Sequence, residues 1–251
     1  MDDASNPDTN AKEARPLPGI RELVTSYPVR LAVYSVSAVL LCQFVFAMIQ
    51  ERGLAYAARE NGPVEIGQVV LAMSTAVLFV IAASCFEKKS ATLAISACLV
   101  GYAAARESDQ WFEAVFFDDA YKHLVGVPLA AIGLWVAWKH PRGVVHELLD
   151  PSRFPMITLF VVAGVHICGL CQIFDRPGLW SGLGAETEIT KAAVEEFAEL
   201  FGYLLLAFSS VESLTDAVHR SSFSFSLTRC SNSRSAREME SIPSRPTCSK
   251  T

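Results

Sequence analysis

The chain has 251 residues, of which 51% are hydrophobic, and its formal net charge at pH 7 is -5. The hydrophobic fraction is only slightly above that of a soluble protein, but the apolar residues are gathered in blocks of helical length between polar ends. Neither the net charge nor any basic, aromatic-rich block points to nucleic acid. The composition therefore predicts an integral membrane protein with no nucleic-acid partner.

The predicted fold is an all-α, multi-pass transmembrane helical bundle of about six spans. We expect a disordered N-terminal cytoplasmic segment over 1–28, a transmembrane domain over 29–213, and a Ser- and Arg-rich disordered cytoplasmic tail over 214–251. The expected spans are 31–49, 66–86, 91–105, 124–138, 154–174 and 192–211. Several are shorter than the roughly twenty residues that cross a bilayer, so five or seven spans are alternatives.

Small and sulfur-containing residues in two of these spans suggest how the helices pack. Ala97, Gly101 and Ala105 recur at every fourth position, a pattern that lets helix backbones approach closely in lipid. Cys168 and Cys171 form a CxxC motif, but a second pair that would pass electrons onward is missing from the chain. Because cysteine is also common as a small buried residue, we interpret both as packing residues.

The lysine and arginine distribution predicts the orientation. With six spans, fifteen of the 21 basic residues fall on the side that carries both ends of the chain. Both termini are therefore expected in the cytoplasm, in a cell membrane of the bacterial inner-membrane type. The expected partner is the lipid bilayer. For the basic tail, contact with anionic lipid headgroups is one interpretation, and a plain solvated tail is the favoured one.

Fourteen of the 26 acidic residues fall on the opposite side, and those at helix ends carry the functional prediction. In the last span, Glu195, Glu196 and Glu199 lie with Tyr203 within an arc of about 100°. A carboxylate at this depth requires a partner, so the helix ends are expected to turn their ionisable groups toward one another. The other spans offer Glu65, Gln68, Arg106, Asp109, Gln110, Glu113, Lys122, His123 and His166.

One specific pair is expected from the depth of the residues in the membrane. His166 and Glu199 lie at similar distances from the same ends of two neighbouring antiparallel spans. The prediction is a Glu199–His166 pair, and the alternative is a histidine satisfied by a backbone carbonyl or a serine hydroxyl.

Three functions fit this pattern. The favoured interpretation is a structural or accessory membrane protein of unknown activity, with interhelical ion pairs such as Arg106 or Lys122 with Glu195. The first alternative is a membrane-embedded enzyme assisted by a divalent metal or by acid/base chemistry, for which no phosphate-loop or nucleophile motif is present. Its candidate catalytic residues are Glu196, Glu199, His166, His123 and Arg106, and its candidate metal ligands are Glu196, Glu199, His166 and Glu65. The second alternative is a cation- or proton-coupled transporter that uses the same carboxylates.

Overall fold

The computed structural model describes residues 26–59, 61–85, 90–174, 176–180 and 187–240. Throughout these ranges the regular structure is helical, with no strand. The α-helices are α2 (Tyr27–Arg52), α3 (Leu54–Ala57), α4 (Pro63–Cys85), α5 (Ala91–Arg106), α6 (Asp109–Val115), α7 (Val127–Lys139), α8 (Pro141–Leu148), α9 (Phe154–Val165), α10 (Cys171–Phe174), α11 (Pro177–Trp180) and α12 (Thr187–Glu240). Two π-helical turns, η1 (Lys122–Gly126) and η3 (His166–Leu170), and the 3₁₀ turn η2 (Pro151–Arg153) precede α7, α10 and α9.

Four helical segments among these residues are long and apolar enough to cross a membrane: Tyr27–Arg52, Pro63–Cys85, Pro151–Phe174 and Glu188–Val218. They correspond to four of the predicted spans. The other two correspond to α5, which is a shorter apolar helix, and to η1 with α7. The all-helical prediction is confirmed, and the four long apolar helices suggest a membrane protein.

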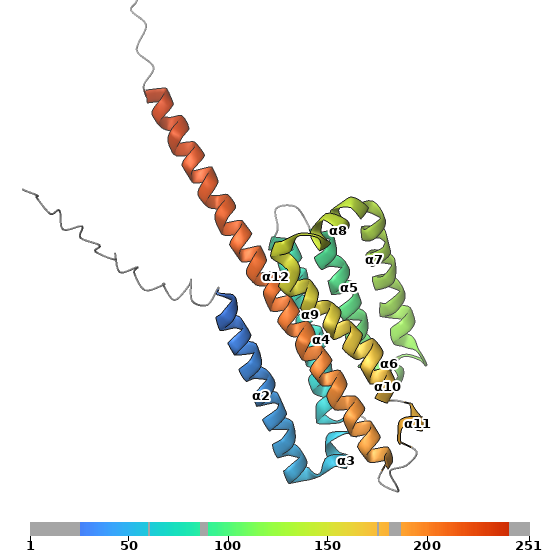
Figure 1. The fold of residues 1–251 in the computed structure, drawn as a ribbon. Helices are drawn as coiled ribbons and strands as arrows, with labels where there is room; N and C mark the ends of the chain where they lie inside the picture. The colour runs from blue at the N-terminus through green and yellow to red at the C-terminus, as the bar shows by residue number, and fades with distance from the viewer. Residues whose placement is uncertain (1–25, 60, 86–89, 175, 181–186, 241–251) are drawn as a thin grey trace, which may run out of the picture.

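Helix α12 is the axis of the bundle (Figure 1). It packs against α4 and α9, α4 packs against α5, and α5 packs against α7. Helix α2 lies at one edge of the bundle and α7 at the other, so both are mainly peripheral (Figure 1). The residues with the most complete burial therefore lie where α4, α5, α9 and α12 meet.

Small side chains dominate this interior. Six of the thirteen residues in its buried cluster are alanines: Ala72, Ala82, Ala97, Ala104, Ala163 and Ala217. Two members of the predicted small-residue pattern, Ala97 and Ala105, are buried, and a Cβ on the third, Gly101, would lie 3.2 Å from Leu129 Cδ1 of α7. Large apolar residues instead point outward, among them Val36, Leu40, Phe44, Val70, Val77, Val161 and Val165. Such an inverted distribution suits a bundle whose exterior meets lipid.

Helix α12 is longer than the sequence pattern indicated. The predicted last span ends at 211 and the tail was expected to be disordered from 214, but the helix continues to Glu240. Neither glycine nor proline occurs between Gly202 and Pro243, and extending an existing helix avoids the cost of nucleating a new one. Residues 241–251, like 1–25 of the expected N-terminal segment, lie outside the described residues.

The π-helical turn η3 brings the α9–α10 segment very close to α12. Ile167 in this turn contacts α12 at Gly202, where a Cβ would lie only 2.4 Å from Ile167 Cγ1. Single π turns re-aim the side chains that follow them. Here the turn also places the ring of His166 against the main chain of α12, with His166 Nε2 2.9 Å from the Ala198 carbonyl oxygen.

We expect Gly202→Ala to lower the free energy of unfolding by about 1–3 kcal/mol, because the added methyl group overlaps Ile167. This loss opposes the gain of about 1 kcal/mol that alanine normally brings to a helix. Thermal unfolding of the purified protein in a mild detergent measures the difference. Gly164→Ala is the matched control, since no atom lies within 4 Å of a Cβ at that helical position. Equal stability of the two variants would contradict the close contact.

Candidate functional site

The carboxylates of α12 meet polar groups of α4 and α5 at one end of the bundle. We call this group the acidic cluster; its members are Gln68, Arg106, Glu107, Glu196, Glu199 and Tyr203. Glu196, Glu199 and Tyr203 lie on successive turns of α12, so they share one face. Gln68 lies in the second turn of α4, and Arg106 and Glu107 lie at the end of α5.

Arg106 serves two carboxylates. Its Nη2 lies 3.4 Å from Glu199 Oε1, and its Nε lies 3.8 Å from Glu107 Oε1. Glu199 is only 5% exposed. The predicted pairing of Arg106 or Lys122 with Glu195 is wrong. The reason is that Glu199, not Glu195, lies on the α12 face turned to α5, while Lys122 Nζ lies 2.6 Å from Asp119 Oδ1 in its own turn.

Glu107 was not among the predicted site residues, yet it is central to the cluster. The hydroxyl of the fully buried Tyr203 donates a hydrogen bond of 2.9 Å to Glu107 Oε1. Burial and the nearby negative charge of Glu199 raise the pKa of Glu107 to about 7, although Arg106 and the Tyr203 hydroxyl act in the opposite direction. Glu107 is therefore a carboxyl group that exchanges its proton near neutral pH. Its position directly after Arg106 at the end of a span was the available signal.

Gln68 binds the carboxylate of Glu196 through its amide nitrogen, while its amide oxygen accepts no hydrogen bond from the described residues. Its Nε2 donates to the backbone oxygen and to Oε2 of Glu196, each at 2.9 Å. The side chain is 0% exposed, and its Oε1 has no hydrogen-bond partner among the described residues. A buried carbonyl oxygen without a donor costs about 1–3 kcal/mol. The cluster thus contains an unused acceptor beside an acid.

The remaining predicted site residues have other partners. His166 contacts the Ala198 carbonyl and the edge of the Phe201 ring, with ring centroids 5.6 Å apart, so the expected Glu199–His166 pair is not formed. His123 is exposed beside Phe117. Glu65 Oε2 accepts a hydrogen bond of 2.6 Å from the backbone nitrogen of Asn61. The structure therefore brings together Arg106, Glu196 and Glu199, but neither histidine.

One group of acids among the described residues has the geometry to hold a metal ion, and it lies elsewhere. Oxygen atoms of Glu113, Asp118 and Asp119 lie within 4.8 Å of one another. Glu113 and Asp118 are exposed, and Asp119 already pairs with Lys122. None of the predicted ligands Glu196, Glu199, His166 and Glu65 belongs to it. The CxxC thiols are both free, with Cys171 buried and Cys168 exposed.

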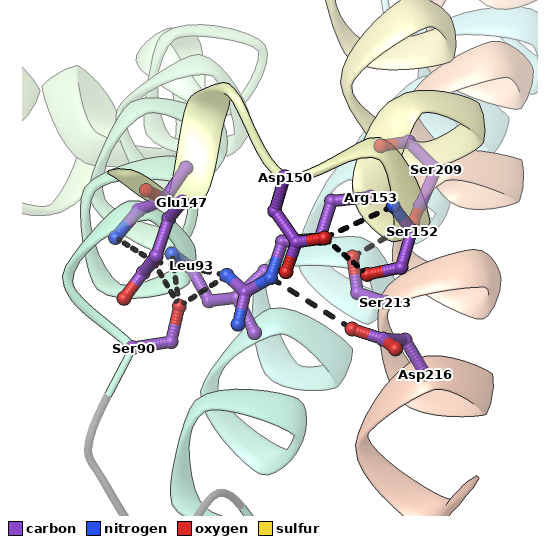
Figure 2. Close-up of polar contacts among 10 residues, drawn as sticks. Ser90, Leu93, Glu147, Asp150, Ser152, Arg153, Ser209, Ser213 and Asp216 are labelled. Atoms are coloured by element: carbon purple, nitrogen blue, oxygen red, sulfur yellow. Dashed lines mark hydrogen bonds and ion pairs between the residues drawn. The ribbon is translucent and has the colours of Figure 1, made fainter. Parts of the chain in front are cut away.

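A second polar cluster lies at the opposite end of the bundle (Figure 2). Arg153, 6% exposed, lies with Nη1 2.9 Å from both Ser90 Oγ and Glu147 Oε2, and with Nε 3.7 Å from Asp216 Oδ2. Burial alone would raise the pKa of Glu147, but the hydrogen bonds from Ser90 and Thr92 and the charge of Arg153 hold it below its usual range. This cluster joins the start of α5, α8 and η2 to α12.

Helix α2 is tied to the same end of α12 by another arginine. Arg30 Nε and Nη2 donate to the two carboxylate oxygens of Glu212, at 2.8 and 3.0 Å, and the Tyr34 hydroxyl donates to Oε1 at 2.8 Å. Sequence reasoning missed both arginine sites. The signal was the polar run Ser209, Ser210, Glu212, Ser213 and Asp216 late in an apolar helix.

Glu107→Gln is expected to change how stability depends on pH. Because the pKa of Glu107 is raised from 4.5 to about 7 in the folded protein, the folded state holds this proton more tightly than the unfolded state. Its stabilising contribution is complete below about pH 4.5 and is lost as the pH rises through about 7. Unfolding in detergent, followed across this window, should show a fall in wild-type stability that the variant partly lacks. Glu113→Gln, at an exposed position of α6, should keep the wild-type slope. An unchanged slope in Glu107→Gln would contradict the shifted pKa.

Comparisons of the chain with protein-family models, curated proteins and solved structures found no match. A fold is in any case compatible with many functions, and activity is carried by the chemistry of a site. The two polar clusters are therefore the basis for a functional proposal.

Proposed function

We propose that the protein is a multi-pass integral membrane protein that binds a small monovalent cation, a proton or Na⁺, at the acidic cluster. The observation that carries the proposal is the fully buried Gln68, whose Oε1 has no hydrogen-bond partner among the described residues while its Nε2 is bound to Glu196. A carbonyl oxygen beside a carboxylate is a ligand set for a hard cation or for a proton donor.

Charge supports the same conclusion. The cluster holds three carboxylates, Glu107, Glu196 and Glu199, and one guanidinium, that of Arg106, which pairs with Glu107 and Glu199. If all three were ionised, three negative charges would lie close to one positive charge in a mostly buried place, which is costly. Uptake of protons or of a metal cation removes this excess. Glu107 then takes part directly, because it can lose its proton near neutral pH when a cation binds.

Six membrane crossings with both ends of the helical domain in the cytoplasm complete the proposal. The crossings are α2, α4, α5, η1 with α7, η3 with its flanking helices, and α12. Two observations support it: the basic residues are concentrated on one side, and Arg30 near the start of α2 binds Glu212 on α12. An even number of crossings returns the chain to the side on which it started. The acidic cluster then faces the periplasmic or extracellular side.

The proposed orientation predicts where reporters function. A reporter that is active only in the cytoplasm should work when fused after Thr251, and one that requires an extracytoplasmic location should work when inserted after Gly182. Both fusions are made in full-length protein and assayed in intact cells. Activity of the extracytoplasmic reporter at the C-terminal fusion would place the acidic cluster on the wrong side and contradict the orientation.

Cation binding predicts a measurable exchange of protons. Adding NaCl, compared with choline chloride, to the protein in lipid nanodiscs near pH 7 should release protons and raise the midpoint of thermal unfolding. A pH-indicator dye measures the release. In Glu199→Gln the release should be lost, because the negative charge that helps to raise the pKa of Glu107 is removed. Glu188→Gln is the matched control, since this exposed glutamate begins the same helix outside the cluster.

Two results bear on the proposal in different ways. Proton binding near pH 7 without any response to Na⁺ would identify the proton as the cation. A wild-type protein that neither exchanges protons nor responds to Na⁺ would contradict the proposal. It would favour a structural or accessory role, for which the interhelical pairs Arg106–Glu199 and Arg153–Glu147 are the specific evidence. The enzyme alternative has less support, because its two candidate histidines contact groups outside the acidic cluster. His166 contacts the Ala198 carbonyl, and His123 contacts the Phe117 ring.

A further inference from the structure

A cavity of about 340 Å³ opens beside the acidic cluster, between α4 and the α5–α6 corner. One wall is the apolar face of α4 with Val69 and Met73, and the facing wall carries the rings of Trp111 and Phe112. The lining also includes two carboxylates, Glu65 and Glu107. The volume is within the range of sites for small organic molecules, which are mostly apolar with a few polar groups.

The two walls are joined by a polar bridge. A hydrogen bond connects Asn61, just before α4, with Gln110 of α6, and Asn61 also donates its backbone N–H to Glu65. Asn61 adopts a positive φ of 53°, which asparagine tolerates better than most residues. The bridge fixes the separation between Glu65 on one wall and the aromatic rings on the other.

The charge of the lining selects among ligands. It contains two acids, of which Glu107 also pairs with Arg106, and within the described part of the chain it contains no lysine, arginine or histidine. A neutral apolar ligand would strip water from the carboxylates without replacing their partners, and an anion would be repelled. A bare inorganic cation would leave the apolar and aromatic walls unused. A positive nitrogen on an apolar body satisfies both parts of the site, and aromatic rings add cation–π attraction.

We propose that this cavity binds a small amphipathic amine, with its ammonium group between Glu65 and Glu107 and its apolar body against Met73, Trp111 and Phe112. This inference rests on the proposed function only through Glu107, which lines the cavity and belongs to the acidic cluster. The cavity would then give an organic cation access to the same carboxylate that exchanges protons.

The test compares three ligands that share a body and differ in charge: 3-phenylpropylammonium, 3-phenylpropanol and 3-phenylpropanoate. Binding is measured by equilibrium dialysis of the labelled compounds against full-length protein in phosphatidylcholine nanodiscs, with empty nanodiscs subtracted. The ammonium compound should bind at least tenfold more tightly than the alcohol, and the carboxylate should not bind. Propylammonium, which lacks the aromatic body, should also bind at least tenfold more weakly.

Variants assign the binding to this cavity. Glu65→Gln and Trp111→Ala should each weaken phenylpropylammonium binding at least fivefold, and Glu51→Gln, an exposed glutamate at the end of α2, should not. Equal binding of the ammonium compound and the alcohol, or wild-type affinity in both cavity variants, would overturn the proposal. In nanodiscs containing phosphatidylethanolamine, loss of the probe would identify a lipid amine as the occupant, and retained binding would identify a soluble amine.

The two proposals can fail separately. Glu65→Gln changes no member of the acidic cluster, so it should keep the Na⁺-induced proton release while weakening amine binding at least fivefold. Amine binding without any proton release in the wild type would support the cavity and contradict the cation site. Proton release with no preference for the ammonium compound would support the cation site and contradict the cavity proposal.

Discussion

A charge buried inside an apolar bundle needs an oppositely charged partner, and three of the buried ion pairs in this protein involve an acid of α12. Near its first turns Glu199 meets Arg106, and near the end of its buried stretch Glu212 meets Arg30 and Asp216 meets Arg153. Breaking one partner of such a pair leaves an uncompensated charge, which costs far more than the pair itself contributes. The arginines thus fix which helices lie beside α12 and at what depth, while the small residues between the two ends allow close packing.

The two ends differ in how completely they are neutralised. At the Arg153 end, hydroxyl groups, a backbone N–H and two arginines surround the acids, and the pKa of Glu147 is lowered accordingly. At the other end one arginine serves two acids, Glu196 relies on a glutamine, and the pKa of Glu107 is raised. Acids matched by nearby positive charges hold helices together, whereas an excess of acids over bases leaves a capacity to bind a cation. For this reason the cation site is proposed at the acidic cluster, whereas the Arg153 cluster is assigned a structural role in holding α5, α8 and η2 against α12.

Glu107 joins the two proposals physically. One of its oxygen atoms accepts the Tyr203 hydroxyl inside the bundle, and its side chain also lines the cavity beside Trp111. A change of its protonation state alters both the charge of the buried cluster and the attraction of the cavity for an ammonium group. Coupling between an inorganic and an organic cation could therefore occur through one carboxyl group, without a conformational change across the bundle.

The sequence by itself determined the all-helical membrane class, the positions of the apolar helices and the fact that Glu196, Glu199 and Arg106 needed partners. These features follow from composition and from a helical period, which are local properties. Only the tertiary structure decided the partners. Glu199 rather than Glu195 faces Arg106, His166 meets the Ala198 carbonyl, and Glu107 turns inward to Tyr203. Helix depth can be estimated from residue spacing, but the rotation of each helix depends on close packing such as that of Ile167 on Gly202. The rotation of each helix about its axis therefore decides which charged side chains form ion pairs.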